Sequence, residues 1–143
     1  IPKDAPLTVV TNALKVVEVF REHSEIDVYL AGGKVKPSGN ITDSLAYQFM
    51  KQFSIDIAFL CGGGVSVNGI STATPEVAAF TRMAASISRR KIILAPGATL
   101  GNNAFAQCVP ITDAEMLITD EEADEEIIKS IEKTGVSVKQ AKL

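Results

Sequence analysis

The sequence has little of several residue types that specialised sites require. It contains one histidine, His23, and two cysteines, Cys61 and Cys108, whose spacing matches no metal-binding motif. We therefore expect no metal ion and no cofactor. A serine nucleophile needs a histidine base, and the only histidine lies in a polar helix exit, so nucleophilic catalysis is not indicated. Two unpaired cysteines without a secretory leader are typical of a reduced, cytoplasmic protein.

Positive charge and long apolar runs are also scarce. Lys and Arg number 14 against 17 Asp and Glu, a net charge of -3, whereas domains that bind nucleic acid usually carry a clustered basic excess. No apolar run approaches the ~20 residues of a membrane span. The chain does have 143 residues, 46% of them hydrophobic, which is enough for one domain with a substantial core. We expect residues 1–143 to be a single domain.

Short apolar strands and amphipathic helices alternate along the chain. Strands are expected at 7–11, 26–31, 55–60, 91–95, 116–119 and 136–138, and helices at 14–20, 44–53, 75–88 and 120–133. This alternation predicts an α/β fold, a Rossmann-like and mostly parallel sheet with helices on both faces. Segment 98–110 has little periodicity and is predicted to be irregular, with a short helical turn at 103–105.

Two helix starts and one helix end carry recognisable signals. Asn12 is expected to cap the helix at 14–20, and Thr42 or Asp43 the helix at 44–53, because short polar side chains accept from the free amides of a first turn. The basic residues 89–91 are expected to end the third helix, where cations interact favourably with the helix dipole.

The stretch from Ser54 to Thr74 joins an apolar strand to a glycine turn. The run 55–60 is predicted to lie mid-sheet, buried on both faces, and it ends in Gly62, Gly63 and Gly64. Without Cβ atoms, the backbone amides of this turn can approach a ligand closely, at the edge where open α/β sheets bind ligands. Alternatively, the glycines only permit a tight strand exit with positive φ angles. A loop of about ten residues precedes the next helix, so neither the dinucleotide nor the P-loop spacing is present.

Small polar groups follow the expected strands. Because the carboxyl ends of parallel strands lie at one edge, these groups could converge on a pocket that suits a phosphorylated or polyhydroxylated molecule. Glu76 is the only acidic residue near these ends, so no general acid and base pair is evident. The predicted binding residues are Thr11, Asn12, Gly32, Gly33, Gly62, Gly63, Gly64, Thr72, Glu76 and Thr99.

Seven phrases, taken in order and spacing, carry a family resemblance. They are LTVVTN at 7–12, LAGGKV at 30–35, DIAFLCGGGV at 56–65, NGIST at 68–72, RRKIILA at 89–95, NAFA at 103–106 and LITD at 117–120. Together they resemble the effector-binding domain of DeoR-family bacterial transcription regulators. The fold of that domain is related to ribose-5-phosphate isomerase and glucosamine-6-phosphate deaminase.

The resemblance implies a ligand sensor rather than an enzyme. It implies that a sugar phosphate or related metabolite binds this domain and changes the DNA affinity of an amino-terminal helix-turn-helix. We expect that helix-turn-helix, and an early strand with a Gly-Thr-Thr phosphate loop, to be absent from this sequence. DNA would then be contacted only through the absent part. We also expect a homo-oligomer. Removal of an amino-terminal strand exposes a sheet edge, which should either pair between chains or be altered.

Two departures from the family pattern bear on the effector. The family usually has an Asp-Ser-Ser-Lys type motif where this chain has residues 96–99, Pro-Gly-Ala-Thr. The usual lysine on the helix after Glu76 appears as Thr81, with Arg82 beside it. Either Arg82, Lys34 and backbone amides bind the effector instead, or the effector is less anionic. Arg82 therefore joins the predicted effector-binding residues.

Two other functions remain open on the same fold. A sugar-phosphate isomerase or deaminase would need a carboxylate base and a lysine at the strand ends, which are scarce here. An oligomerisation module with a vestigial pocket is favoured by the missing lysine and aspartate. Binding of a ligand to the folded chain separates a sensor from a scaffold, because a ligand that prefers the native state raises its stability.

Overall fold

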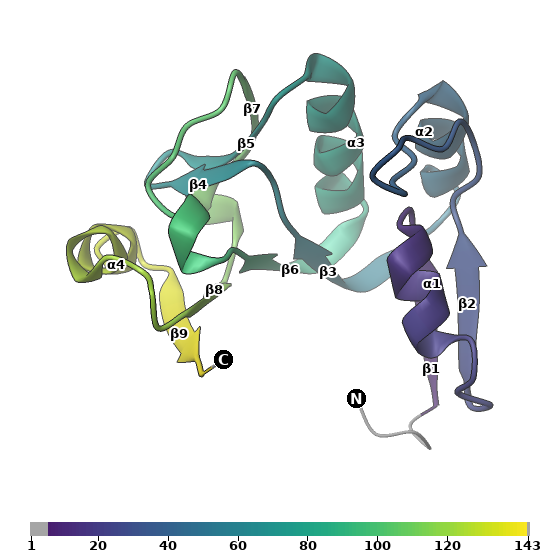
Figure 1. The fold of residues 1–143 in the computed structure, drawn as a ribbon, viewed down its shortest axis with the longest axis horizontal. Coiled ribbons are helices and arrows are strands. Elements are labelled where there is room, and N and C mark those ends of the chain that lie inside the picture. Colours follow the sequence, from purple (N-terminus) through teal and green to yellow (C-terminus); the bar gives the residue numbers. More distant parts are fainter. Residues whose placement is uncertain (1–5, 143) are drawn as a thin grey trace. The chain divides into compact units, whose positions relative to one another are not determined.

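The computed structural model describes residues 6–142 (Figure 1). The chain divides into two compact units, Ile1–Gln52 and Phe53–Leu143, which we call unit 1 and unit 2. Each unit is described by itself, and the organisation of the chain as one domain stays a prediction. None of the helices within residues 6–142 is both long enough and apolar enough to cross a membrane.

Unit 1 alternates strand and helix as predicted. Its elements are β1 (Leu7–Thr11), α1 (Leu14–Phe20), β2 (Ile26–Leu30) and α2 (Ser44–Met50). The two strands pair in parallel, with Leu7 opposite Ile26 and Thr11 opposite Leu30. Parallel pairing requires a crossover between the strands, and α1 lies in that crossover.

The predicted role of Asn12 as a helix cap is wrong. Ala13 occupies the cap position of α1 and makes no side-chain hydrogen bond to the first turn. The Asn12 side chain instead donates from Nδ2 to the Ile41 carbonyl at 3.0 Å, and the Ile41 amide donates back to the Asn12 carbonyl at 3.0 Å. Asn12 therefore fixes the approach to α2 rather than the start of α1.

Unit 2 contains a parallel sheet and an antiparallel sheet. Its elements are β3 (Ile55–Leu60), β4 (Gly64–Ser66), β5 (Gly69–Thr72), α3 (Pro75–Ser86), β6 (Ser88–Leu94), η1 (Gly97–Thr99), β7 (Ala106–Pro110), η2 (Ile111–Asp113), β8 (Met116–Asp120), α4 (Glu125–Glu132) and β9 (Ser137–Ala141). The parallel sheet has the order β3-β6-β8-β9 and the antiparallel sheet the order β4-β5-β7. The predicted α/β class with a mostly parallel sheet is thus confirmed.

The core of unit 2 lies on one face of the parallel sheet. Leu60, Ile93 and Leu117 are in register across β3, β6 and β8 and are buried there. Alanines of α3 and isoleucines of α4 belong to the same buried cluster. The small alanine side chains let α3 approach the sheet closely, and burial of the larger residues supplies most of the stabilisation.

Within unit 2, the strand at 55–60 that was predicted to lie mid-sheet is at the edge of its sheet. In this unit β3 hydrogen-bonds in a sheet only with β6. The face opposite the core exposes Ile57, Leu94 and Phe59, the last 59% exposed. An apolar run shows that both faces of a strand can be buried, but it does not identify the elements that cover them.

The antiparallel sheet is absent from the sequence prediction. Residues expected to be a long loop after the glycine turn form β4 and β5, and a segment expected to be irregular forms β7. Asn68 and Gly69 carried the signal, since Asn-Gly between alternating apolar residues favours a tight hairpin. Gly69 has φ of 123° and packs against the Val109 carbonyl, where a Cβ has no room. The short helix lies at η1, not at 103–105.

Helix α2 ends at Met50 rather than at 53, and boundaries of α3 and α4 also differ from prediction. Helix α3 ends at Ser86, and residues 89–91 lie in β6 instead of ending the helix. Arg89 pairs with Asp56 at 3.3 Å and Arg90 with Glu115 at 2.6 Å. Helix α4 begins at Glu125 rather than at 120, because Asp124 caps it by accepting from the Glu126 amide at 2.8 Å.

Candidate functional site

The turn after β3 presents backbone amides that have no partner. Gly63 is exposed and Gly62 half-buried. Neither amide donates a hydrogen bond to any atom of residues 6–142. Unpaired backbone N–H groups are strong donors that are satisfied by water or by a ligand. We call residues 62–64 the glycine turn.

Close packing explains the outer two glycines of this turn. A Cβ on Gly62 would lie 2.6 Å from Ile70 Cγ2 and 2.7 Å from the Ser71 carbonyl oxygen. A Cβ on Gly64 would lie 2.5 Å from the Asn102 carbonyl oxygen, whereas the atoms nearest to a Cβ on Gly63 are 4.0 Å away. None of the three has a positive φ, so the alternative based on positive φ is wrong. Of the three positions, only Gly63 has room for a Cβ.

The segment 101–104 lies against the glycine turn and is fastened by polar contacts. The Gly101 amide donates to the Val65 carbonyl at 2.6 Å, and the Ala104 amide donates to Ser71 Oγ at 2.8 Å. Ser66 Oγ donates to Asn103 Oδ1 at 2.8 Å. The carbonyl and hydroxyl oxygens of β4 and β5 are thus used to hold this segment.

Thr99 is brought near the glycine turn, but its hydroxyl is engaged locally. The hydroxyl donates to the Pro96 carbonyl at 2.9 Å, and the next residue, Leu100, pairs with Val65. Sequence reasoning did not select Asp120, the buried carboxylate that supports the start of η1, the short helix that contains Thr99. Asp120 accepts from the Gly97 amide at 3.0 Å and from the Glu122 amide at 2.9 Å. The carboxylate at this edge therefore comes from the end of β8.

Thr72 and Arg82 meet around Cys108 instead of at the glycine turn. The Thr72 hydroxyl donates to the Thr74 carbonyl at 3.0 Å and accepts from the Cys108 thiol at 3.7 Å. Arg82 Nη1 donates to the Gln107 carbonyl at 2.7 Å. Burial raises the pKa of the Cys108 thiol, and the Thr72 hydrogen bond and the Arg82 charge offset this only in part. Glu76 is exposed in the first turn of α3.

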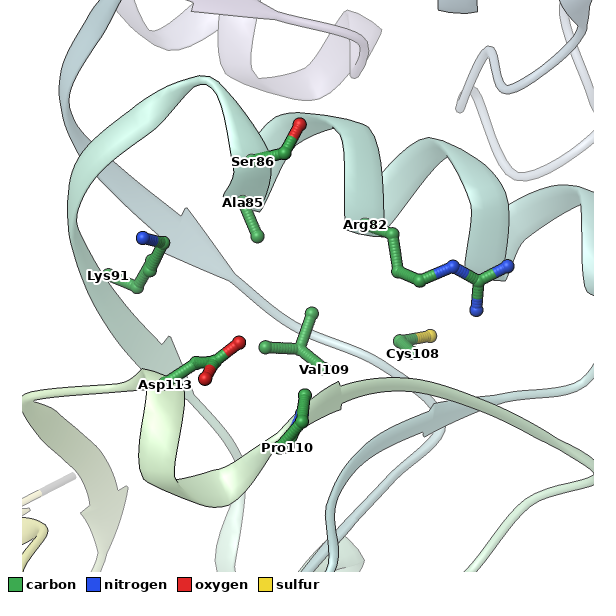
Figure 2. Close-up of a pocket in the computed structure, with 8 residues that line it drawn as sticks. All are labelled: Arg82, Ala85, Ser86, Lys91, Cys108, Val109, Pro110 and Asp113. Carbon is green, nitrogen blue, oxygen red and sulfur yellow. The ribbon is translucent and has the colours of Figure 1, made fainter.

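Arg82 lines a cavity that does not include the glycine turn. The cavity has a volume of about 310 Å³ and lies between α3, β6, β7 and η2. Figure 2 shows its lining, with Ala85 and Val109 between Lys91 on one side and Arg82 on the other. Arg82 is therefore not brought to the same place as Gly62, Gly63 and Gly64.

In unit 1 the predicted residues follow the ends of β1 and β2. The Thr11 hydroxyl accepts from the Ala13 amide at 3.1 Å, and Asn12 is engaged with Ile41 as described above. Gly32 and Gly33 are exposed, and their amides donate no hydrogen bond within the described part of the chain. A Cβ on Gly33 would collide with the Asp43 carboxylate.

Asp43 organises the loop that follows β2. Its carboxylate accepts from the Lys34 amide at 3.0 Å and from the Ala46 amide at 3.2 Å, so it caps α2 as predicted. Donation from the Lys34 amide is the main reason that the pKa of Asp43 lies below its ordinary value. Residues 6–142 contain no group of three His, Cys, Asp or Glu side chains that could hold a metal ion.

Comparison with known proteins identifies the family. A protein-family model described as the DeoR C terminal sensor domain matches residues 1–121. The chain belongs to this family of sensor domains. It is therefore a regulatory sensor domain of the DeoR type, and the resemblance to DeoR-family regulators is confirmed.

Three curated relatives show how far the likeness extends. The transcriptional repressor GlcR of Bacillus subtilis is 26% identical over 92% of this chain and 51% of its own length. The regulator YgbI of Escherichia coli is 27% identical over 95% of this chain and 54% of its own. The glycerol-3-phosphate regulon repressor of Haemophilus influenzae is 25% identical over 79% and 45%. The sensor domain spans about half the length of the curated relatives it matches.

The packing at the glycine turn predicts unequal effects of alanine in this sensor domain. Gly64→Ala should lower the free energy of unfolding by about 1–3 kcal/mol, because its Cβ meets backbone that cannot move away easily. Gly63→Ala should change it by less than about 0.5 kcal/mol. Urea unfolding followed by circular dichroism measures both, and equal losses would contradict this account of the turn.

The contacts of Asp43 predict a pH-dependent contribution to stability. A folded-state pKa below the unfolded value adds stability that is complete above about pH 4 and is lost as the pH falls through the folded pKa. Asp43→Ala should therefore lower the melting temperature at neutral pH, and the deficit should shrink in acid. Glu22→Ala, which removes an exposed carboxylate of unit 1, is the control. A deficit that is independent of pH would refute the role of the charge.

Proposed function

We propose that this sensor domain binds a sugar phosphate or a related phosphorylated metabolite, and that binding changes the DNA affinity of the whole regulator. The family assignment supports a sensor. One of the relatives is named for a glycerol-3-phosphate regulon, which supports phosphorylated carbon compounds as the ligand class. In this proposal the ligand lies against the glycine turn that follows β3 in unit 2.

The observation that carries the proposal is the pair of unpartnered amides at Gly62 and Gly63. Successive backbone N–H groups form anion-binding concavities without any charged side chain. The family lysines are missing from this chain, so amide donors at the glycine turn replace them in the proposed site. In unit 1, taken by itself, Gly32 and Gly33 have the same kind of donor after β2 and stay predicted binding residues.

An enzymatic reading is less well supported by the site. The Asp120 carboxylate uses both oxygens to accept from backbone amides, so it is a poor candidate for a general base. Glu76 lies exposed at the start of α3. The relatives described above are named as transcriptional regulators or repressors, which fits a protein that senses its ligand without converting it.

The amide proposal predicts that removing one N–H abolishes ligand binding. Gly63→Pro lacks the amide donor, whereas Gly63→Ala keeps it, and the site has room for a Cβ. Glucosamine 6-phosphate, ribose 5-phosphate and glycerol 3-phosphate should raise the melting temperature of the wild type and of Gly63→Ala in a saturable way. Gly63→Pro should lose the shift at an unchanged circular dichroism spectrum. Turnover of a sugar phosphate, or an equal shift in all three proteins, would refute the proposal.

Self-association is a second candidate function, favoured by the edge of β3. An edge strand presents unpaired N–H and C=O groups that pair readily with another chain. In unit 2 this edge is accompanied by the exposed side chains of Ile57 and Phe59. We propose that a second copy of the chain pairs at this edge.

The pairing proposal predicts an effect of charge on the oligomeric state. Phe59→Lys places a charge on the exposed face beside the edge and should shift the chain toward the monomer, since lysine is a common device for blocking edges. Light scattering after size-exclusion chromatography measures the mass. Phe105→Lys is the control, because Phe105 is 84% exposed but lies outside the strands. A monomeric wild type, or equal effects of the two substitutions, would contradict the proposal.

A further inference from the structure

The cavity beside α3 contains charges that the rest of the structure leaves uncompensated. Three basic residues follow one another in β6, and the first two are paired with Asp56 and Glu115. The side chain of Lys91, the third, makes no hydrogen bond or ion pair within residues 6–142. The exposed side chain of Asp113, which also lines the cavity, likewise has none in the described chain. Two opposite charges thus border one cavity without pairing.

The position of Lys91 is unusual for a lysine. It is in register with Ala58, on the sheet face that carries the core residues Leu60 and Ile93. Lysine is rarely placed toward a core unless its ammonium group has a partner. Here the half-buried side chain lines the cavity, so a ligand or water must supply that partner.

The charged groups stand at two ends of the cavity. Figure 2 shows Lys91 and Asp113 toward one end and Arg82 with Cys108 toward the other, with Ala85 and Val109 between them. Arg82 donates one N–H to the Gln107 carbonyl. Its other guanidinium N–H groups can donate to an acid. A hydroxyl placed between Lys91 and Asp113 would accept from the ammonium group and donate to the carboxylate. The middle of the cavity suits a short apolar body.

We propose that this cavity is a second binding site, for a small elongated acid with a hydroxyl group at its far end. The acid binds Arg82, and the hydroxyl binds Lys91 and Asp113. At about 310 Å³ the cavity lies at the lower end of the volumes of small-molecule sites. The site is independent of the glycine turn and does not rest on the function proposed above.

An NMR titration of the chain with γ-hydroxybutyrate tests the proposal. The amide signals of Ala85, Val109 and Asp113 should shift in a saturable way. Butyrate, which lacks the hydroxyl, should bind at least about tenfold more weakly, the usual effect of losing a hydrogen bond to a charged group. Shifts that do not saturate, or equal affinities for the two acids, would overturn the proposal.

Matched variants distinguish the cavity from other basic sites. Lys91→Gln and Arg82→Gln should each weaken γ-hydroxybutyrate binding at least about tenfold. Arg89→Gln removes the neighbouring, already paired cation and should leave the affinity unchanged. Gly63→Pro should also leave it unchanged, so the outcome does not depend on the glycine turn. Equal losses in Lys91→Gln and Arg89→Gln would overturn the site, provided that unfolding curves show all variants folded.

Discussion

Close contact between backbone segments at the carboxyl end of β3 is the constraint on which unit 2 depends. The Ser71 and Asn102 carbonyl oxygens occupy the space that side chains on Gly62 and Gly64 would need. This contact brings the antiparallel sheet and the segment 101–104 against the end of the parallel sheet. Within this turn only Gly63 has room for a side chain.

Unit 2 handles charge in two different ways. In the proposed site at the glycine turn the donors are backbone amides, which would attract an anion without adding net charge to a chain that carries -3. In β6 the side chains of Arg89 and Arg90 are neutralised by partners, whereas Lys91 lines the cavity. One strand thus carries both structural ion pairs and the charge that the proposed second site uses.

Local sequence patterns predicted the helices and strands better than they predicted the long-range contacts of individual side chains. The strands of the parallel sheets and the helix opened by Pro75 follow from apolar periodicity and capping, and Asp43 caps α2 as expected. Asn12 has the same capping chemistry, but a carbonyl 29 residues away captures its side chain. Likewise, the partners of Arg89 and Arg90 come from β3 and from the residue before β8. The partner that each of these side chains finds depends on residues far away in the sequence, which a local pattern does not contain.

Of the candidate site, the sequence predicted only the glycine turn, whose exposure depends on backbone chemistry rather than on side-chain contacts. Glycines after a strand identify an exposed turn, and Gly62 to Gly64 form one, but the sequence does not show which of them the chain itself covers. A ligand alters a regulator only by binding two states differently. Ala104 lies 4.0 Å from the Cβ position of Gly63, in a segment fastened by three polar contacts rather than by core packing. A ligand at Gly63 would therefore lie beside a segment that polar contacts hold against β4 and β5, and a change in those contacts is one way for a ligand to favour one state over another.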